Sequence, residues 1–103
     1  MDFIYHITRA VDWEQALQDG EYTVATLGRT LADEGFIHGS HADQVQTVRD
    51  TFYRDVPDLV LLVIDPGLVN APIRYDVVPG QPEPFPHVYG PLNTDAVIEV
   101  RPL

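Results

Sequence analysis

Three histidines in similar surroundings are the residues that most favour a functional site. His6 follows Tyr5 in a segment rich in aromatic and β-branched residues. His38 precedes Gly39-Ser40, and His87 follows a proline-rich stretch. An imidazole can exchange a proton near neutral pH, and it can donate or accept hydrogen bonds. If the fold brings the three together, we expect one shared site, although a single histidine in such a place is more often structural.

A metal site is the first alternative. His38 and His41 are three residues apart, which suits two ligands on one helical turn. We place His38 on a strand and His41 at the start of a helix, so this spacing does not make their rings converge. Asp76 could complete a set of ligands, but nothing in the sequence places it there. We therefore predict no metal.

Nucleophilic catalysis is the second alternative. An imidazole can activate a nearby hydroxyl, and the candidate pairs are Ser40 with His38 and Thr8 with His6. Ser40 is also the expected cap of a helix, and the Gly-x-Ser-x-Gly spacing of a nucleophile elbow is absent from the sequence. The chain has no cysteine, which excludes thiolate catalysis, disulfides and cysteine-based zinc sites. The residues therefore favour histidine chemistry over a covalent nucleophile.

The charge composition limits the partners of the protein. Sixteen acidic residues face six arginines and no lysine, so the formal net charge is -10. Such a surface repels phosphate backbones, and a general nucleic-acid binder is disfavoured, although a local arginine pocket could hold one phosphate. The start of the chain lacks the pattern of a signal peptide, and the longest apolar run, Leu59 to Ile64, is too short to cross a bilayer. We expect a cytoplasmic protein without a membrane partner.

The elements that must position these residues fit one α+β domain over residues 1–103, with a mixed sheet and two helices. One helix begins near Asp12 and stops at Gly20, and another is capped by Ser40 with Asp43 three residues later. We expect a loop with a short turn near Leu31 over residues 21–34. Aromatic, β-branched or continuous apolar runs predict strands at residues 3–8, 36–38, 59–64, 73–78 and 96–100.

The segment 79–86 holds four prolines in eight residues. Proline lacks the N–H that a strand ladder needs and cannot continue a helix. We therefore predict a stiff excursion here, and not a strand, that delivers His87 and Tyr89 to a defined place.

Two segments carry a specific family resemblance: Gly35-Phe36-Ile37-His38-x-Ser40 and Phe85-Pro86-His87-x-Tyr89-Gly90-Pro91-Leu92. Together with Tyr5-His6-Ile7-Thr8 and Arg74-Tyr75-Asp76, they resemble the family called domain of unknown function 952, from end to end of the chain. That family is in turn similar to the ADP-ribosyltransferase fold, with the RNA 2'-phosphotransferases among its nearer relatives.

The resemblance implies a cleft for a nucleotide. Tyr5-His6-Ile7-Thr8 partly matches a Tyr-His-Gly-Thr signature of the superfamily, and Ile37-His38-Gly39-Ser40 matches a Val-His-x-Ser strand end. By this resemblance His6 would hold a ribose or an amide, with His38 and Ser40 lining the same cleft. The protein would then be a transferase, or a former one, related to ADP-ribosyltransferases, with NAD as the candidate cofactor.

Some positions depart from the superfamily pattern. Ile7 stands where the signature has glycine, whose bare backbone lets a nicotinamide ring approach. Asp76 replaces a glutamate and would be the anion beside an oxocarbenium-like centre. The candidate bases around a phosphate are Arg9, Arg29 and Arg74, which is few for transfer on RNA.

We therefore expect a histidine-lined cleft that binds a small molecule or nucleotide. The candidate catalytic residues are His6, His38 and Asp76. The candidate ligand-binding residues are Tyr5, Thr8, Ser40, Arg74, His87 and Tyr89. One alternative is a non-catalytic module that binds a small ligand or a protein, and another is that the histidines are structural. The sequence predicts no particular oligomeric state.

Overall fold

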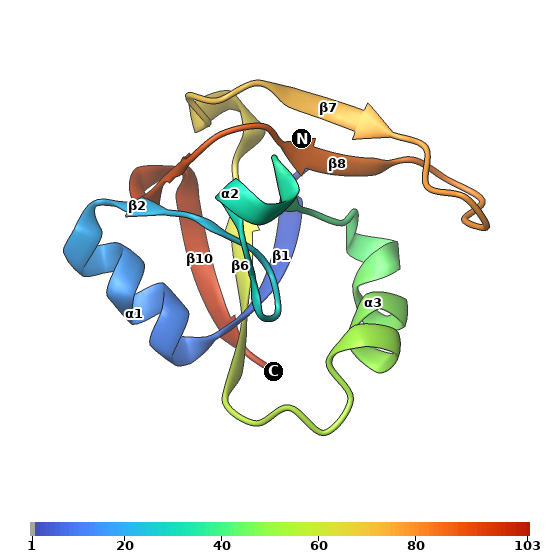
Figure 1. Cartoon of the computed structure of the whole chain (residues 1–103), viewed down its shortest axis with the longest axis horizontal. Coiled ribbons are helices and arrows are strands. Elements are labelled where there is room, and N and C mark those ends of the chain that lie inside the picture. Colours follow the sequence, from blue (N-terminus) through green and yellow to red (C-terminus); the bar gives the residue numbers. More distant parts are fainter. Residues whose placement is uncertain (1) are drawn as a thin grey trace.

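The computed structural model describes residues 2–103, and a three-stranded antiparallel sheet lies at its centre (Figure 1). β6 (Leu59–Ile64) lies between β1 (Ile4–Arg9) and β10 (Val97–Pro102). In the register, Ile4 faces Ile64 and Arg9 faces Leu59. The continuous apolar run of β6 is typical of a strand that is covered on both faces, as the sequence predicted.

Three smaller sheets surround this centre, and all their pairs are antiparallel in the described residues 2–103. Two of them have two strands each: β2 (Glu21–Tyr22) with β9 (Leu92–Asn93), and β3 (Val24–Thr26) with β4 (Arg29–Thr30). The third has the order β5 (Ile37–His38), β8 (Phe85–Val88) and β7 (Ile73–Asp76). A bridge between Tyr5 and Ser40 joins this sheet to the central one.

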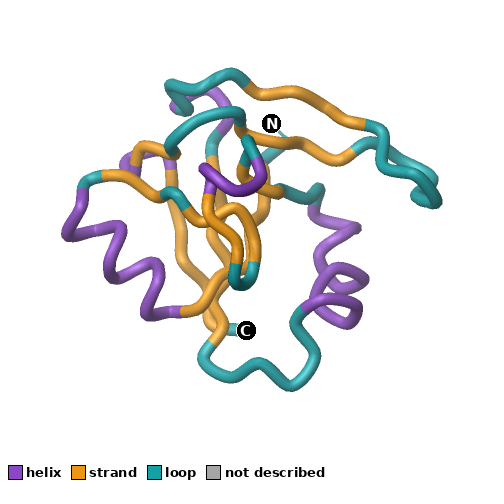
Figure 2. Tube along the Cα trace, viewed as in Figure 1, coloured by secondary structure: helices purple, strands orange, loops and turns teal. Residues whose placement is uncertain are grey.

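The helices lie on opposite sides of the central strands (Figure 2). α1 (Ala10–Asp19) lies on one side and α3 (Val45–Phe52) on the other, with the short α2 (Leu31–Glu34) between them (Figure 1). α1 ends at Gly20, which has the left-handed φ of 84° that a glycine stop provides. The remaining helical turns are the 3₁₀ helices η1 (Ala42–Gln44), η2 (Pro66–Leu68) and η3 (Thr94–Ala96). Within residues 2–103, none of the helices is long and apolar enough to cross a membrane.

The two faces of the central sheet contribute to separate apolar clusters. Because side chains alternate along a strand, Ile4 and Ile7 of β1 belong to different clusters. The larger cluster joins α1 through Trp13 to the buried ends of β5 and β8. The smaller one packs Ile7 and Leu61 against Tyr53, which follows α3. The sheet therefore fixes the position of β1, where the first site motif lies.

The α+β class and the single compact unit are confirmed, while several details differ from the sequence prediction. The ladders of the described chain are antiparallel instead of mixed. The segment predicted as a loop over residues 21–34 contains the short strands β2, β3 and β4 and a third α-helix, α2. The Thr30 side chain accepts a hydrogen bond from the Asp33 N–H, and Asp33 accepts one from the Thr30 N–H, so a capping box starts α2. The third detail is β8, whose residues Phe85–Val88 lie partly in the predicted excursion.

The strand β8 forms because Pro86 lies beyond the end of one neighbour. Pro86 is paired with Tyr75 of β7, whereas the ladder with β5 stops at the pair of His87 and His38. The missing N–H of Pro86 is therefore not required on the β5 side. The excursion itself is confined to residues 77–84, which project from the body of the molecule beyond α3 (Figure 1).

The helix expected after Ser40 also begins later than predicted. Its first turn is η1, and His41 is the residue that precedes it. The His41 N–H donates to the Gln44 side chain at 2.8 Å, so this glutamine closes the turn. Ser40 exchanges backbone hydrogen bonds with Tyr5 at 2.8 Å instead of capping the helix.

Candidate functional site

A pocket of about 460 Å³ lies among β1, the segment from Glu34 to Ser40, α3 and the loop between β7 and β8. This volume is within the range of small-molecule sites, roughly 300–1,000 Å³. Eight of the eighteen lining residues are aromatic or aliphatic: Tyr5, Ile7, Phe36, Val48, Phe52, Tyr53, Val78 and Phe85. The polar lining residues are His6, Thr26, Glu34, His38, Ser40, Thr47, Thr51, Gln81 and His87. The three histidine segments therefore meet at one cavity.

His6 lies in the wall with both ring nitrogens already in use. Its Nδ1 donates to the carbonyl of His38 at 2.5 Å, and its Nε2 accepts from the Tyr22 hydroxyl at 2.6 Å. Burial lowers the pKa of His6 to about 4, so the ring is neutral at pH 7. His6 therefore joins β1 to β5 and β2, and it has no nitrogen left for a ligand.

His87 is oriented by a carboxylate. Its Nδ1 lies 2.8 Å from Asp76 Oδ2, and the Tyr89 hydroxyl donates to the same oxygen. The hydrogen bond from Tyr89, followed by that from His87, lowers the pKa of Asp76. An ionised carboxylate only accepts hydrogen bonds, so the proton of His87 is on Nδ1 and the Nε2 lone pair is exposed to a ligand.

The protonation state of His87 follows from two opposing effects. Its side chain is only 5% exposed, and burial lowers the pKa of His87 while the bond to Asp76 raises it. Burial is the larger effect, so the pKa lies below the ordinary value for histidine. His87 therefore presents a neutral imidazole at pH 7.

His38 forms a second pair of the same kind at the end of α2. Its Nε2 donates to Glu34 Oε1 at 3.1 Å, and the Arg29 Nη2 donates to Glu34 Oε2 at 3.1 Å. The bond from His38 is the main cause that lowers the pKa of Glu34. His38 therefore has its proton on Nε2, and Nδ1 has no partner among residues 2–103.

Phe36 holds the two imidazoles in place. Its ring stacks on His87, with 4.3 Å between centroids and 21° between planes, and it lies 4.7 Å from the ring of His38. The centroids of His38 and His87 are 5.3 Å apart. Tyr89, which binds Asp76, is 5.2 Å from the Phe36 ring. One aromatic residue thus contacts both histidines and one of their supporting groups.

The structure does not bring every predicted residue to the cavity. Tyr5, His6, His38, Ser40 and His87 line it. Four others lie outside its wall: Thr8, Arg74, Asp76 and Tyr89.

Each of the four outside residues has another place. Asp76 and Tyr89 support His87 from behind, and the Arg74 guanidinium lies 5.1 Å above the Tyr89 ring. Thr8 is buried, and its hydroxyl has no hydrogen-bond partner in the described chain. The catalytic role predicted for Asp76 is therefore indirect in this geometry, because its carboxylate reaches the cavity only through His87.

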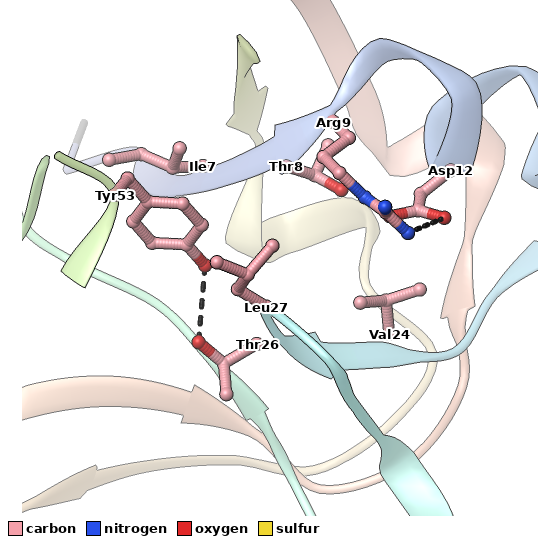
Figure 3. A pocket seen from close by; sticks show the side chains of 8 residues that line it. All are labelled: Ile7, Thr8, Arg9, Asp12, Val24, Thr26, Leu27 and Tyr53. Carbon is pink, nitrogen blue, oxygen red and sulfur yellow. Dashed lines mark hydrogen bonds and ion pairs between the residues drawn. The ribbon is translucent and has the colours of Figure 1, made fainter. Parts of the chain in front are cut away.

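A second depression surrounds Thr8 (Figure 3). Arg9 pairs with Asp12 at 2.9 Å on its rim, and the hydroxyls of Thr26 and Tyr53 are hydrogen-bonded at 3.1 Å. The depression has no internal volume that could hold a water molecule. Despite its polar residues, it is a packed crease and not a ligand site.

The sequence prediction missed Glu34, Phe36 and Tyr22 as site residues. Glu34 lay at the end of a segment read as a loop, although its spacing of four residues from His38 is the spacing of the observed pair. Phe36 lies inside the motif that contains His38, and only the fold shows that it also stacks on His87.

The part of the chain that the structure describes contains no group of side chains that fits a metal site. The His41 ring stacks on Tyr75, with 5.9 Å between centroids, and His41 does not line the pocket. Within residues 2–103, no three histidine, cysteine or acidic side chains are grouped so that they could hold a metal ion.

Comparisons with known proteins identify similar sequences and folds. The family described as "Protein of unknown function (DUF952)" matches residues 7–100. The crystal structure of CC0527 from Caulobacter crescentus has a TM-score of 0.86 and 27% identity, and the match covers 98% of this chain and 85% of that one. The solution NMR structure of CC0527 gives 0.76 and 31%, with 98% and 84% covered. CC0527 is described as a structural-genomics target without a stated activity, and no curated protein matches this chain.

Proposed function

We propose, from the premise that this chain belongs to the DUF952 family of proteins of unknown function, that its pocket is a small-molecule site with the imidazoles of His38 and His87 as the recognition groups. The ligand has a flat or compact apolar body that fills the aromatic part of the wall. Its polar groups donate hydrogen bonds to His38 and His87.

One observation carries this proposal: His38 and His87 line one cavity, and each is bound to a carboxylate through one nitrogen. Such a carboxylate fixes the tautomer and the orientation of the ring. Each histidine thus keeps one lone pair for a ligand. His6, by contrast, uses both of its ring nitrogens inside the protein.

His87 is also the candidate general base. A neutral imidazole whose Nδ1–H is held by Asp76 can take a proton on Nε2 from a bound hydroxyl or amine. Burial makes His87 a weaker base than a free histidine, because it disfavours the protonated ring. Asp76 and Tyr89 act in this proposal as positioning residues, since they reach the ligand only through His87.

A narrower form of this proposal is that the small molecule is a nucleotide, as the ADP-ribosyltransferase resemblance implies. The bridge between Tyr5 and Ser40 lies between the two motif segments and supports a cleft shared by them. None of the candidate bases Arg9, Arg29 and Arg74 lines the pocket. The nucleoside part of a ligand such as NAD would therefore enter, and its diphosphate would stay outside.

A titration followed by amide NMR tests the proposed function. Uniformly labelled protein is titrated with adenosine, nicotinamide riboside, NAD and a library of small aromatic compounds. We expect shift changes concentrated at Phe36, Val48 and Phe85, which line different sides of the cavity. Absence of any such change across the whole series would contradict the proposal.

Two matched variants distinguish pocket binding from surface effects. His87→Phe removes the ring nitrogens and keeps an aromatic ring of similar size, so we expect it to weaken binding about tenfold or more, the value of one hydrogen bond of about 1.5 kcal/mol. His41→Phe makes the same exchange outside the pocket, where the ring contacts Tyr75, and should leave binding unchanged. Binding without any turnover would identify the non-catalytic module instead of an enzyme.

A further inference from the structure

We infer, resting on the small-molecule function proposed above, that the pocket selects a ligand with a positive charge: a primary ammonium group on an apolar, preferably aromatic, body. Three features of the wall favour such a ligand: its charge, its hydrogen-bonding groups and its aromatic rings.

The charge of the wall is negative. Among the described residues that line the cavity, Glu34 is the only acidic one, and none is an arginine or a lysine. Arg29 pairs with the outer oxygen of Glu34 at 3.1 Å, but its side chain is 55% exposed and does not line the cavity. Such a solvated pair is weak. Glu34 therefore remains the charged group that a ligand would meet.

Glu34, His38 and His87 present hydrogen-bond acceptors at one part of the wall. His38 Nδ1 and His87 Nε2 have lone pairs because their other nitrogens donate to carboxylates, and the Glu34 carboxylate also accepts. The three groups are close together, since Glu34 lies 3.1 Å from His38 and the two imidazole centroids are 5.3 Å apart. An ammonium group has three donors and no acceptor, so it complements this set.

The same groups disfavour an anion. A carboxylate or phosphate has no proton to donate to the two lone pairs, and Glu34 would repel it. Across the molecule, the net charge of -10 attracts cations towards the surface and repels anions.

Aromatic rings make up much of the remaining wall. Tyr5, Phe36, Phe52, Tyr53 and Phe85 all line the cavity. The face of an aromatic ring attracts a cation, and several rings around one cavity are a known way to hold an organic ammonium group. Phe52 is 65% exposed although it is a large apolar residue, so it is available to cover a ligand that enters beside α3.

A series of three compounds with the same ring tests the inference: benzylammonium, benzyl alcohol and benzoate. Their dissociation constants are measured at pH 7 by NMR titration with the protein. We expect benzylammonium to bind about tenfold more tightly than benzyl alcohol, in line with a partly desolvated cation–π contact. Benzoate should bind more weakly than the alcohol.

Two variants show whether Glu34 is responsible. Glu34→Gln removes the charge and keeps a carbonyl oxygen that can accept from His38, and it should reduce the ratio of amine to alcohol affinity at least threefold. Glu83→Gln removes the same charge from the exposed loop between β7 and β8, which borders the pocket without Glu83 lining it. It should keep the ratio of the natural protein, and the amide spectrum of each variant shows that it is folded.

Three results would overturn the inference. The first is alcohol or benzoate binding that equals or exceeds amine binding, and the second is an unchanged ratio in Glu34→Gln. The third is that no compound of the series binds while a nucleoside or another aromatic compound does. In all three the proposed small-molecule function stands; it fails only if nothing in either series binds.

Discussion

Lowering the pH should destabilise this protein through His6, and the size of the effect follows from its burial. The pKa of His6 is about 4 in the folded state against an ordinary value of 6.5. Between these values the unfolded chain binds a proton that the folded chain does not, so stability is lost as the pH falls from about 6.5 towards 4. With about 1.4 kcal/mol for each pKa unit, the loss reaches about 2 kcal/mol at pH 5 and about 3 kcal/mol at pH 4.

This loss is a large part of the stability of a domain of this size, which is commonly about 5–15 kcal/mol. It has a defined geometric origin. A proton on Nε2 would remove the acceptor of the Tyr22 hydroxyl and place a charge in a site that is 2% exposed. Protonation of His6 therefore weakens the contact between β1, β2 and β5.

The variant His6→Gln isolates this contribution. Its amide can donate to the His38 carbonyl and accept from Tyr22, but it does not titrate. Urea unfolding at pH 7, 6, 5 and 4, followed by the fluorescence of the buried Trp13, gives the free energy of unfolding for both proteins. We expect the variant to be less stable at pH 7, because its side chain is smaller, and to lose about 3 kcal/mol less than the natural protein by pH 4.

The difference between the two pH profiles removes the contribution of the other titrating groups to the free energy of unfolding. Asp33, Glu34, Asp76 and Glu99 have lowered pKa values in the folded state and lose stabilisation as the pH falls through those values, but they are present in both proteins. Parallel pH profiles for the two proteins would refute the account of His6 as a buried neutral link.

Further predictions concern the neighbours of the site. Thr8→Val should raise the free energy of unfolding by about 1 kcal/mol, measured by urea unfolding, because it removes a buried hydroxyl that lacks a partner. Gly39→Ala should lower it by about 1–3 kcal/mol, since a Cβ there would lie 2.5 Å from the Pro86 carbonyl oxygen; an equally stable variant would contradict this. Asp76→Asn should lower the pKa of His87 further, as seen by NMR titration of its ring protons, because the carboxylate raises it. An unchanged or higher value would show that Asp76 does not support this ring.

The sequence contained enough information for the central elements. The run from Leu59 to Ile64 is apolar at every position because both faces of β6 are covered, and such a run is recognisable without the structure. The stop of α1 at Gly20 was equally local, since it depends on the φ of one residue. These elements place β1 and therefore His6.

The sequence prediction was wrong for β8 and α2. The first of these elements depends on neighbours that are far away in the chain. Whether Phe85–Val88 forms a strand depends on where β5 ends beside Pro86, and no local pattern records that. The capping box of α2, formed by Thr30 and Asp33, is local, but the helix that it starts has only four residues, which is too short for a periodic pattern. Missing α2 also hid the role of Glu34.

The sequence predicted which histidines meet at the site, but not the hydrogen-bond partners that give each of them its role. One cavity is lined by His6, His38 and His87. Their surroundings in the sequence are similar, but their roles in the structure differ. Burial and the hydroxyl of Tyr22 make His6 a structural link, whereas Glu34 and Asp76 leave the other two rings with free lone pairs. Those partners are set by the packing of separate strands, so the spacing of residues in the sequence could not assign the roles.

The most direct test of the central claim is a ¹⁵N spectrum of the histidine rings at pH 7, recorded with and without benzylammonium. We expect the two rings to bind their carboxylates through opposite nitrogens, His38 through the proton on Nε2 and His87 through the proton on Nδ1. Added ligand should shift the free nitrogens, His38 Nδ1 and His87 Nε2, and leave the ring of His6 unchanged. The same tautomer in both rings, or a ligand response at His6 instead of His87, would contradict it.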